Sequence, residues 1–393
     1  MFRSIHPFPA RMAPEIVLRV LDGDTGRKRV LDPMAGSGTT VVSARMRGYR
    51  AYGVDSDPLA VMISSAASSD FDEERFRSDS NRLLKRARIA LRKMCDAEAY
   101  PVGADEETKE FIRYWFDRRS RRQLAAIVTA LGQGRYRTRP FLLCAFSRMI
   151  ITKKGGVSLA WDVSHSRPHR KREVAPVAPF RSFMTNVEAV TRRAHFQGDG
   201  VLPRATVLRG DCRRLRFKAR MFDFIITSPP YLNAIDYLRG HKMSLVWFGH
   251  PIKALRRLRA KSVGSEVGSA ASTWDHVVDK MVAQPDRVPS RLRGIMRRYV
   301  HDMSEAISEM KRVAKKGCRV VLVVGDCTVR GTEIRNSSAI DILCKNAGMT
   351  LARRKRRPLQ RQHRYLPPPS ERSRRGQITE RLWDEVILEY DVA

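Results

Sequence analysis

A strand–turn–helix–strand pattern near the N-terminus constrains the fold of this chain more than any other feature of its sequence. The apolar run Arg29–Asp32 ends in an acid and leads into a glycine-rich turn at 33–38. Thr39–Met46 then has a helical pattern, and a second apolar run at 50–54 ends at Asp55. This order predicts two parallel strands joined by a helix.

The glycine turn has the features of a nucleotide-type site. Gly36 and Gly38 permit positive φ and a close backbone approach to a ligand, and the helix that opens at Thr39 presents free N–H groups to it. Asp55 follows Gly36 by 19 residues, where an acid holds ribose hydroxyls in dinucleotide-binding folds. The turn lacks the Lys of a phosphate-binding loop, and Val41 stands where a third glycine would be. A merely tight structural turn is the competing interpretation, and the paired acid disfavours it.

Further short apolar runs extend this pattern into a sheet. They lie at 205–208, Phe222–Thr227 and 319–324, and runs at 349–355 and 384–390 are predicted to form an antiparallel edge. We therefore expect the α/β class, with a Rossmann-like, mainly parallel, seven-stranded sheet.

The segment between the second strand and residue 205 exceeds what such a sheet needs. Residues 109–131, 140–151 and 181–195 have helical periodicity, and 153–179 is rich in Pro, Ser, His and cations. These patterns predict a group of helices that carries a basic loop.

The domain organisation follows from these segments. We predict one domain made of 1–65 and 200–393, interrupted by a helical insertion at 66–199 that carries the basic loop. The polar stretch 252–295, with GSEVGSAAS at its centre, is predicted to be a mobile loop.

The tetrapeptide SPPY follows the apolar strand Phe222–Thr227, so it should lie at the carboxyl end of that strand. Two consecutive prolines fix φ and leave carbonyl groups aimed outward. The Ser228 hydroxyl and the Pro229 carbonyl can accept hydrogen bonds from an amino group. Tyr231 offers a flat face on which a base can stack. A rigid loop with a core tyrosine is the competing interpretation, and the upstream glycine turn disfavours it.

These motifs together resemble the amino-group DNA methyltransferases that use S-adenosylmethionine. The matching segments, in chain order, are HPFPARMAPEIV, VLDPMAGSGTT, GVDSDPLA, GDCRRL and TSPPY. The SPPY form resembles the cytosine-N4 branch, whereas adenine-N6 enzymes more often carry DPPY or NPPY. The resemblance covers about 1–65 and 205–255.

The resemblance implies a class I methyltransferase fold, S-adenosylmethionine as cofactor, and methyl transfer to the exocyclic N4 amine of a flipped cytosine in duplex DNA. It implies a catalytic loop formed by Ser228, Pro229, Pro230 and Tyr231. The residues it implies as cofactor contacts are His6, Pro7, Asp32, Pro33, Gly36, Ser37, Gly38, Thr39, Thr40, Asp55 and Asp211.

Several other functions stay open at this point. Adenine-N6 DNA methylation is the first alternative, and an RNA or tRNA amino-methyltransferase is a weaker one. A nicotinamide oxidoreductase would explain the glycine turn but neither SPPY nor the charge, and a catalytically silent DNA-binding protein would leave SPPY without a purpose. The recognition sequence, the oligomeric state and a cognate restriction endonuclease are left open.

The charge of the chain indicates its partner. Lys and Arg number 75 against 41 Asp and Glu, a formal net charge of +34, which argues against an ordinary neutral metabolic enzyme and favours a polyanion. We expect this partner to be double-stranded DNA. The candidate DNA contacts are Arg167, Arg170, Lys171, Arg172, Arg256 and Arg257. We therefore assign catalysis to 1–65 and 200–393, recognition of the DNA target to the insertion 66–199, and further DNA contact to the loop 252–295.

Predictions about localisation and metal binding follow from the absence of apolar segments and of metal-ligand motifs in the sequence. No apolar run approaches the roughly 20 residues of a membrane span, and the N-terminal residues lack the apolar stretch of a signal peptide. We therefore expect no membrane partner and a cytoplasmic, nucleoid-associated protein of prokaryotic or phage origin. The six cysteines are scattered without metal-ligand spacing, so no metal site is expected.

Overall fold

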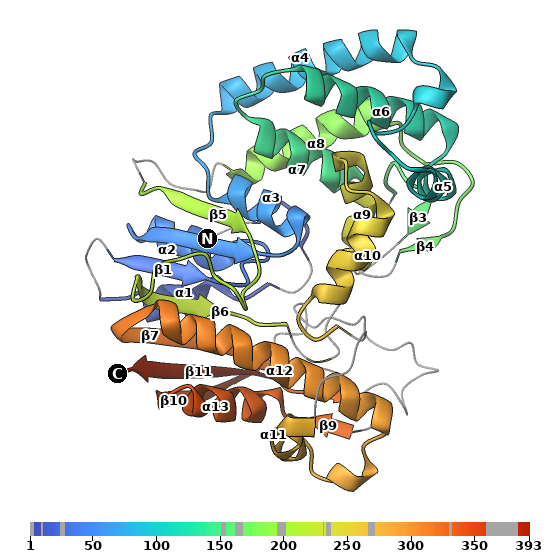
Figure 1. Cartoon of the computed structure of the whole chain (residues 1–393). Helices are drawn as coiled ribbons and strands as arrows, with labels where there is room; N and C mark the ends of the chain where they lie inside the picture. Colours follow the sequence, from blue (N-terminus) through green and yellow to red (C-terminus); the bar gives the residue numbers. More distant parts are fainter. Residues whose placement is uncertain are drawn as a thin grey trace.

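The computed structural model describes residues 4–8, 11–23, 28–150, 155–161, 168–194, 202–230, 232, 237–265, 272–329, 332–358 and 384–393. A twisted sheet with helices on both faces forms one part of the molecule, and a group of helices forms a second part beside it (Figure 1). Within the described residues, none of the helices combines the length and the apolarity needed to cross a bilayer.

The sheet has seven strands, and most of its pairings are parallel. The strands are β1 (Arg29–Asp32), β2 (Arg50–Asp55), β5 (Ala205–Arg209), β6 (Phe222–Thr227), β7 (Ala314–Gly325), β10 (Met349–Pro358) and β11 (Asp384–Val392). Their order is β10-β11-β7-β6-β1-β2-β5. β1 runs parallel to β2 and β6, β2 to β5, and β6 to β7. The expected α/β class is therefore confirmed.

The antiparallel end of the sheet differs in one respect from a simple edge. β11 pairs antiparallel with both β7 and β10, so β11 alone runs against the sheet and β10 is the outermost strand. Ile387 and Leu388 of β11 point to opposite faces and are both buried, as an interior strand requires. The exposed cations of β10 suit an edge, because charged side chains discourage pairing with another chain.

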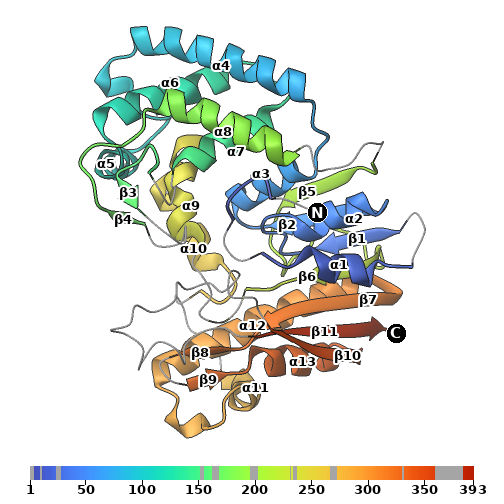
Figure 2. The same cartoon turned by 180° about the vertical axis from the view of Figure 1, so that it is seen from behind.

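Two hydrophobic cores lie on the two faces of the sheet. One face is covered by α1 (Pro14–Val20) and α2 (Thr39–Met46), the other by α12 (Ser290–Val313) and α13 (Asn336–Asn346) (Figures 1 and 2). α12 buries a continuous stripe at helical spacing. α11 (Asp275–Lys280) packs beside α12 and α13.

A third core holds the helical part of the molecule together. Its helices are α3 (Pro58–Ala67), α4 (Glu73–Lys93), α5 (Glu106–Trp115), α6 (Arg118–Gln133), α7 (Arg139–Ile150), α8 (Pro179–Ala194), α9 (Tyr237–Leu245) and α10 (Ile252–Lys261). Short antiparallel pairs, β3 (Ala160–Trp161) with β4 (His169–Arg170) and β8 (Cys327–Val329) with β9 (Thr332–Ile334), lie outside the sheet. Because α9 and α10 share this core, the region after SPPY packs on the predicted insertion.

Two expectations about secondary structure are wrong. The single helix expected at 109–131 is two helices, because Asp117 begins α6 by accepting the Ser120 N–H at 2.7 Å. The segment 252–295, expected as a loop, contains α10, α11 and the start of α12. Leu255, Val277 and Val278 are buried, so packing of these apolar residues overrides the polar composition. The centre of that segment, 266–271, lies outside the described residues.

Candidate active site

The order of the strands brings four separate sequence motifs to one edge of the sheet. The carboxyl ends of β6, β1, β2 and β5 lie side by side. In that order they carry Ser228, the glycine turn 33–38, Asp55 and Asp211. Open α/β sheets bind their ligands outside the carboxyl ends of the strands. This edge is therefore the candidate active site.

The glycine turn has the conformation that its composition predicted. Gly36 has φ 50° and Gly38 has φ 83°, values that side-chain-bearing residues rarely adopt. Gly38 is the N-cap of α2, so the helix opens directly from the turn. The space is also tight, since a Cβ on Gly38 would lie 2.5 Å from Ser64 Oγ and one on Gly36 would lie 3.5 Å from the Phe8 ring.

Hydroxyl groups at the end of the turn and the start of α2 form hydrogen bonds that fix the position of this helix. Ser37 and Thr39 are both buried, and their hydroxyl oxygens lie 3.3 Å apart. The Thr40 hydroxyl donates to the carbonyl of Ile226 in β6 at 3.1 Å. Pro33 is the first residue of the turn, directly after β1. The start of α2 is therefore anchored to the strand that leads into SPPY.

Asp55 fixes the glycine turn to the end of β2. Its Oδ2 accepts the Gly36 N–H at 2.8 Å, and its Oδ1 accepts the Asp57 N–H at 2.9 Å. Because a carboxylate has about four lone-pair positions, each oxygen can still accept a hydroxyl. Burial, together with the negative charge of Asp57, raises the pKa of Asp55 to about 7. Asp55 therefore titrates near neutral pH.

Asp32 joins β1 to β6 at the same edge. Its Oδ1 accepts the Thr227 hydroxyl at 2.6 Å and the Met34 N–H at 3.1 Å. Burial raises the pKa of Asp32 to about 6, although these hydrogen bonds favour the ionised form. Thr227, which precedes Ser228, is thus hydrogen-bonded to Asp32, which precedes the glycine turn.

The hydroxyl group of Ser228 has a defined direction. It donates to the backbone carbonyl of Val323 in β7 at 3.0 Å. Since a hydroxyl has one proton, Ser228 acts towards any further partner as an acceptor. Pro229 is buried and Pro230 is half-buried, so the loop is held by packing as well as by its fixed φ. Tyr231 lies outside the described residues.

Asp211 lies beside Asp55 but is engaged by a neighbour. The Gly210 N–H donates to the Asp55 carbonyl at 3.0 Å, and the Asp211 carboxylate accepts from the guanidinium of Arg213 at 2.7 Å. Burial by itself would raise the pKa of Asp211, but Arg213 holds it below the usual value. Arg213 is itself held by Asp302 of α12 at 2.6 Å. Asp211 is therefore an anion in a fixed position.

His6 is buried, and its ring contacts a helix of the third core. Its Nε2 lies 3.0 Å from the Ser147 hydroxyl of α7, which donates to Ser244 of α9 at 3.0 Å. Pro7 and His6 line a cavity of about 20 Å³ beside these serines. The cofactor contacts implied for His6 and Pro7 stay predictions.

Sequence reasoning gave no role to two residues at this edge, Asp57 and His241, and placed Phe8 only within an upstream cofactor-flanking motif at 7–9. The His241 ring of α9 and the Asp57 carboxylate form a buried hydrogen bond, and Phe8 packs on His241 and against the glycine turn. The sequence contains a signal for Asp57, because an acid before Pro58 is a typical helix start. No local signal could identify His241.

The first basic segment forms a hairpin against α5. The Arg170 guanidinium lies 5.0 Å from the ring centre of Tyr114 in α5, and the Lys171 ammonium lies 4.3 Å from that of Trp161. Arg172 is half-buried, and its buried Nη1 has no hydrogen-bond partner among the described residues. Arg167 lies outside the described residues.

The second basic segment reaches the same helix from another side. Arg256 of α10 forms an ion pair with Glu107 of α5, and the Ile252 N–H donates to the Thr108 hydroxyl at 3.0 Å. Arg257 is exposed on α10. The structure therefore brings two cation-rich segments, distant in sequence, onto one short helix (Figures 1 and 2).

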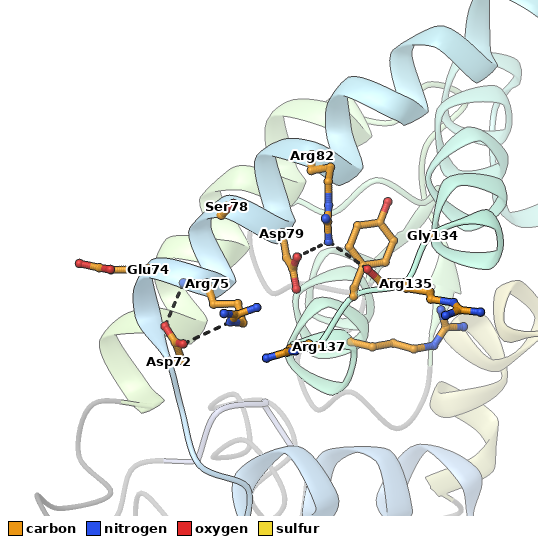
Figure 3. Close-up of a pocket in the computed structure, with 11 residues that line it drawn as sticks. Asp72, Glu74, Arg75, Ser78, Asp79, Arg82, Gly134, Arg135 and Arg137 are labelled. Atoms are coloured by element: carbon orange, nitrogen blue, oxygen red, sulfur yellow. Dashed lines mark hydrogen bonds and ion pairs between the residues drawn. The ribbon is translucent and has the colours of Figure 1, made fainter.

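An arginine-rich cavity of about 790 Å³ lies away from this edge, between α4 and the connection from α6 to α7 (Figure 3). Arg82 donates to Asp79 at 2.5 Å and to the carbonyl of Arg135 at 2.9 Å, and Arg75 lies 3.4 Å from Asp72. The lining contains none of the predicted site residues. Pairing with these acids is typical of a solvated surface, so we do not assign the active site to this cavity.

Comparison by sequence finds Type II methyltransferases. No family model matches the chain. The chain is 23% identical over 282 residues to M.BsoBI of Geobacillus stearothermophilus, a match that covers 62% of this chain and 51% of that protein. It is 22% identical over 371 residues to M.AvaI of Nostoc, covering 81% and 72% of the two chains. It is 21% identical over 378 residues to M.MvaI of Kocuria varians, covering 86% and 80%.

These relatives confirm the resemblance to methyltransferases, although the chain spans only about half the length of M.BsoBI. Among solved structures, a SAM-dependent methyltransferase from Methanosarcina mazei aligns with 98% of this chain and 99% of its own, at 9% identity and a TM-score of 0.36.

Proposed function

We propose that this chain is a DNA methyltransferase that transfers a methyl group from S-adenosylmethionine to the exocyclic N4 amine of a cytosine flipped out of duplex DNA. The observation that carries the proposal is the sheet order β6-β1-β2, which sets Ser228 beside the glycine turn and Asp55. Similarity to Type II methyltransferases supports the reaction class. Methylation of adenine N6 is the alternative for the base.

The residues at this edge fit the proposed cofactor. Gly36 and Gly38 have no side chains, so the backbone of the turn can lie close to the cofactor. Asp55 would accept hydrogen bonds from the ribose hydroxyls. The anionic Asp211 would accept a hydrogen bond from the amino group of the adenine. When bound, S-adenosylmethionine supplies an electrophilic methyl group on a positively charged sulfur.

Ser228 and Pro229 would prepare the amine. The lone pair of an exocyclic amine is delocalised into the ring, so the amine is a poor nucleophile. Ser228, whose proton is already donated to Val323, accepts one N–H, and the carbonyl of Pro229 accepts the other. Two hydrogen bonds to fixed acceptors localise the lone pair and aim it, and such positioning supplies much of the acceleration in a transfer reaction.

The product identifies the reaction. The purified chain is incubated with methyl-labelled S-adenosylmethionine and either duplex DNA or tRNA, and the nucleosides are separated by mass spectrometry. N4-methylcytosine in DNA supports the proposal. N6-methyladenine alone replaces the base but leaves the proposed cofactor site standing. Label only in tRNA contradicts DNA as substrate, and no label in any nucleic acid contradicts methyl transfer itself.

The affinity for S-adenosylmethionine should depend on pH through Asp55. The ionised carboxylate accepts hydroxyls, and the pKa of Asp55 is raised to about 7. Affinity is therefore expected to fall about tenfold per pH unit below this value and to be constant above it. Calorimetry measures the affinity for S-adenosylmethionine at several pH values. A range of about four pH units, from roughly pH 5 to 9, covers both sides of the pKa of Asp55.

Asp55→Asn keeps the shape of the side chain and removes the titration. It should bind more weakly by about 1.5–3 kcal/mol at high pH and show no step near pH 7. A step that remains near pH 6 belongs to Asp32, whose pKa is about 6. A wild-type profile without a step would contradict the role assigned to Asp55.

We propose the basic hairpin and α10, which meet on α5, as a DNA-contact surface. Affinity for duplex DNA is expected to fall with salt, with a log–log slope of about 0.9 per phosphate contact. Neutralising Arg170, Lys171 and Arg172 together should lower the slope by about 2 to 3. Filter binding or fluorescence anisotropy at several salt concentrations measures it.

The matched control removes the same charge elsewhere. Lys85, Arg86 and Arg88 are exposed on α4, and neutralising these three should leave the slope nearly unchanged. If both triple variants lower the salt slope equally, DNA affinity depends only on the net charge of the protein. The hairpin would then not be a specific DNA contact.

A further inference from the structure

Positive charge is concentrated at one end of β10, the outermost strand of the sheet. Five consecutive cations, Arg353–Arg357, fill the second half of this strand, whereas its first half, 349–352, carries no charged side chain. Four of the five side chains are exposed, and that of Arg357 is half-buried. Residues 353–357 are called the cationic end of β10 below.

The cationic end lies at the same edge of the sheet as the candidate active site. β11 runs antiparallel to both β7 and β10, so β10 has the same direction as β7 and β6 (Figure 2). The carboxyl ends of strands that run in the same direction lie at one edge of a sheet. The cations at the end of β10 and the SPPY loop at the end of β6 therefore share this edge.

The register of the strands shows how far along this edge the cations reach. Thr227 pairs with Leu322 of β7, and Leu322 pairs with Leu388 of β11. Leu388 pairs with Arg354. Arg354 is thus level with the last residue of β6, and the next three cations extend beyond it.

The row of backbone pairs next to Ser228 leads to Lys355. The Ser228 hydroxyl donates to the carbonyl of Val323 at 3.0 Å. Val323 pairs with Ile387 of β11, and Ile387 pairs with Lys355. Three strand spacings of roughly 4.8 Å separate β6 from β10, so the two ends of this row are about 14 Å apart.

Two of the five cations have partners that hold β10 in place. Arg354 donates to the hydroxyl of Ser337 in α13 at 2.9 Å. Arg357 forms an ion pair with Glu385 of β11 at 3.4 Å. These two side chains therefore contribute to the packing of the edge strand.

The other three cations form no ion pair within the described part of the chain. Glu389 is opposite Arg353 in the strand pair, but its carboxylate binds Arg19 of α1 at 3.0 Å. Exposed cations without an internal partner can attract an external anion. The three are Arg353, Lys355 and Arg356.

Protection of the edge strand explains only part of this charge. Charged side chains on an edge discourage pairing with another chain. That requirement holds along the whole strand, but Thr350 and Ala352 are exposed and uncharged. The position of the cations, at the end nearest SPPY, therefore needs a further reason.

We propose that the cationic end of β10 binds the phosphate backbone of duplex DNA, a few base pairs from the base that the SPPY loop receives. The inference rests on the proposed function. Each DNA strand carries one phosphate per about 3.4 Å of helix axis, so a distance of about 14 Å corresponds to about four base pairs. Guanidinium groups suit this partner, because they donate two parallel hydrogen bonds to a phosphate.

Neutralising the three unpaired cations tests the contact. The triple variant carries Arg353→Gln, Lys355→Gln and Arg356→Gln, and it keeps Arg354 and Arg357 with their partners. The log–log slope of duplex-DNA affinity against salt is expected to fall by about 2 to 3, because each phosphate contact contributes about 0.9. Fluorescence anisotropy of a labelled duplex oligonucleotide at several salt concentrations measures the slope.

Three cations at the opposite edge of the same sheet provide the control. Arg216, Lys218 and Arg220 are exposed in the segment that leads into the amino end of β6. Changing these three to Gln removes the same charge and should leave the slope nearly unchanged. Equal reductions of the slope by the two Gln variants would overturn the inference.

Replacement by Glu separates DNA contact from edge protection. Glu keeps a charge on the strand, so an edge that only needs protection tolerates it. A phosphate-binding edge is repelled by it, so Glu at 353, 355 and 356 should weaken DNA binding at least about tenfold more than Glu at the control positions. Equal effects of the two Glu variants would leave edge protection as the role of these cations.

The outcomes also separate this inference from the proposed function. If the wild type methylates duplex DNA and the Gln variant of β10 keeps the wild-type slope, the inference alone is wrong. If the wild type does not bind duplex DNA, or methylates only tRNA, the proposed function is wrong and this inference is wrong with it.

Discussion

Ser228→Ala is expected to lower methyl transfer by about 10²-fold while cofactor affinity stays at the wild-type level. The hydroxyl is held by Val323 so that it accepts from the amine, and alanine removes one of the two proposed acceptors. The magnitude is that found when one preorganised hydrogen-bonding group is removed from a transition state. Single-turnover transfer to duplex DNA and calorimetry with S-adenosylmethionine provide the two measurements.

Ser308→Ala is the matched control for this change. Ser308 is exposed on α12 and donates to the Ser304 carbonyl one turn away at 2.8 Å, so its loss should leave both quantities unchanged. Wild-type turnover by Ser228→Ala would rule out the hydroxyl as an acceptor for the amine. Equal losses of turnover and cofactor affinity would instead indicate a collapsed site.

Gly38→Ala is expected to destabilise the protein by about 2–5 kcal/mol and to abolish measurable cofactor binding. The left-handed φ of 83° costs a residue with a side chain about 1–2 kcal/mol. The added Cβ would also lie 2.5 Å from Ser64 Oγ and 3.0 Å from Ser64 Cα, and such overpacking costs about 1–3 kcal/mol. Denaturant unfolding and calorimetry measure the two effects.

Gly48→Ala separates the cost of the left-handed backbone from the cost of the steric contact with Ser64. Gly48 has φ 85°, but a Cβ there would meet nothing within 4 Å. It should therefore lose only about 1–2 kcal/mol and bind the cofactor normally. If Gly38→Ala and Gly48→Ala lower the free energy of unfolding equally, Ser64 must move to accommodate the added Cβ. The close contact between Gly38 and Ser64 would then not be required for the shape of the turn.

Local sequence signals were sufficient for the elements nearest the site. β1, α2 and β6 have the predicted bounds, because each consists of a short periodic run that ends at a proline, a glycine or an acid. The α5–α6 break at Asp117 was missed, because apolar residues continue at helical spacing on both sides of it. Composition misled at 252–295, where buried Leu255 and Val277 outweigh a Gly/Ser-rich centre.

The sequence by itself determined which groups could do chemistry: a glycine turn before a helix, an acid after the next strand, and SPPY after a third strand. Only the tertiary structure decided how they meet. Asp32 with Thr227, Ser228 with Val323 and Asp57 with His241 are contacts between residues 95 to 195 positions apart. The raised pKa of Asp55 likewise depends on its burial, which exists only in the folded chain. Local periodicity reports on residues within a few turns of one another, whereas strand order and burial depend on the packing of the whole chain.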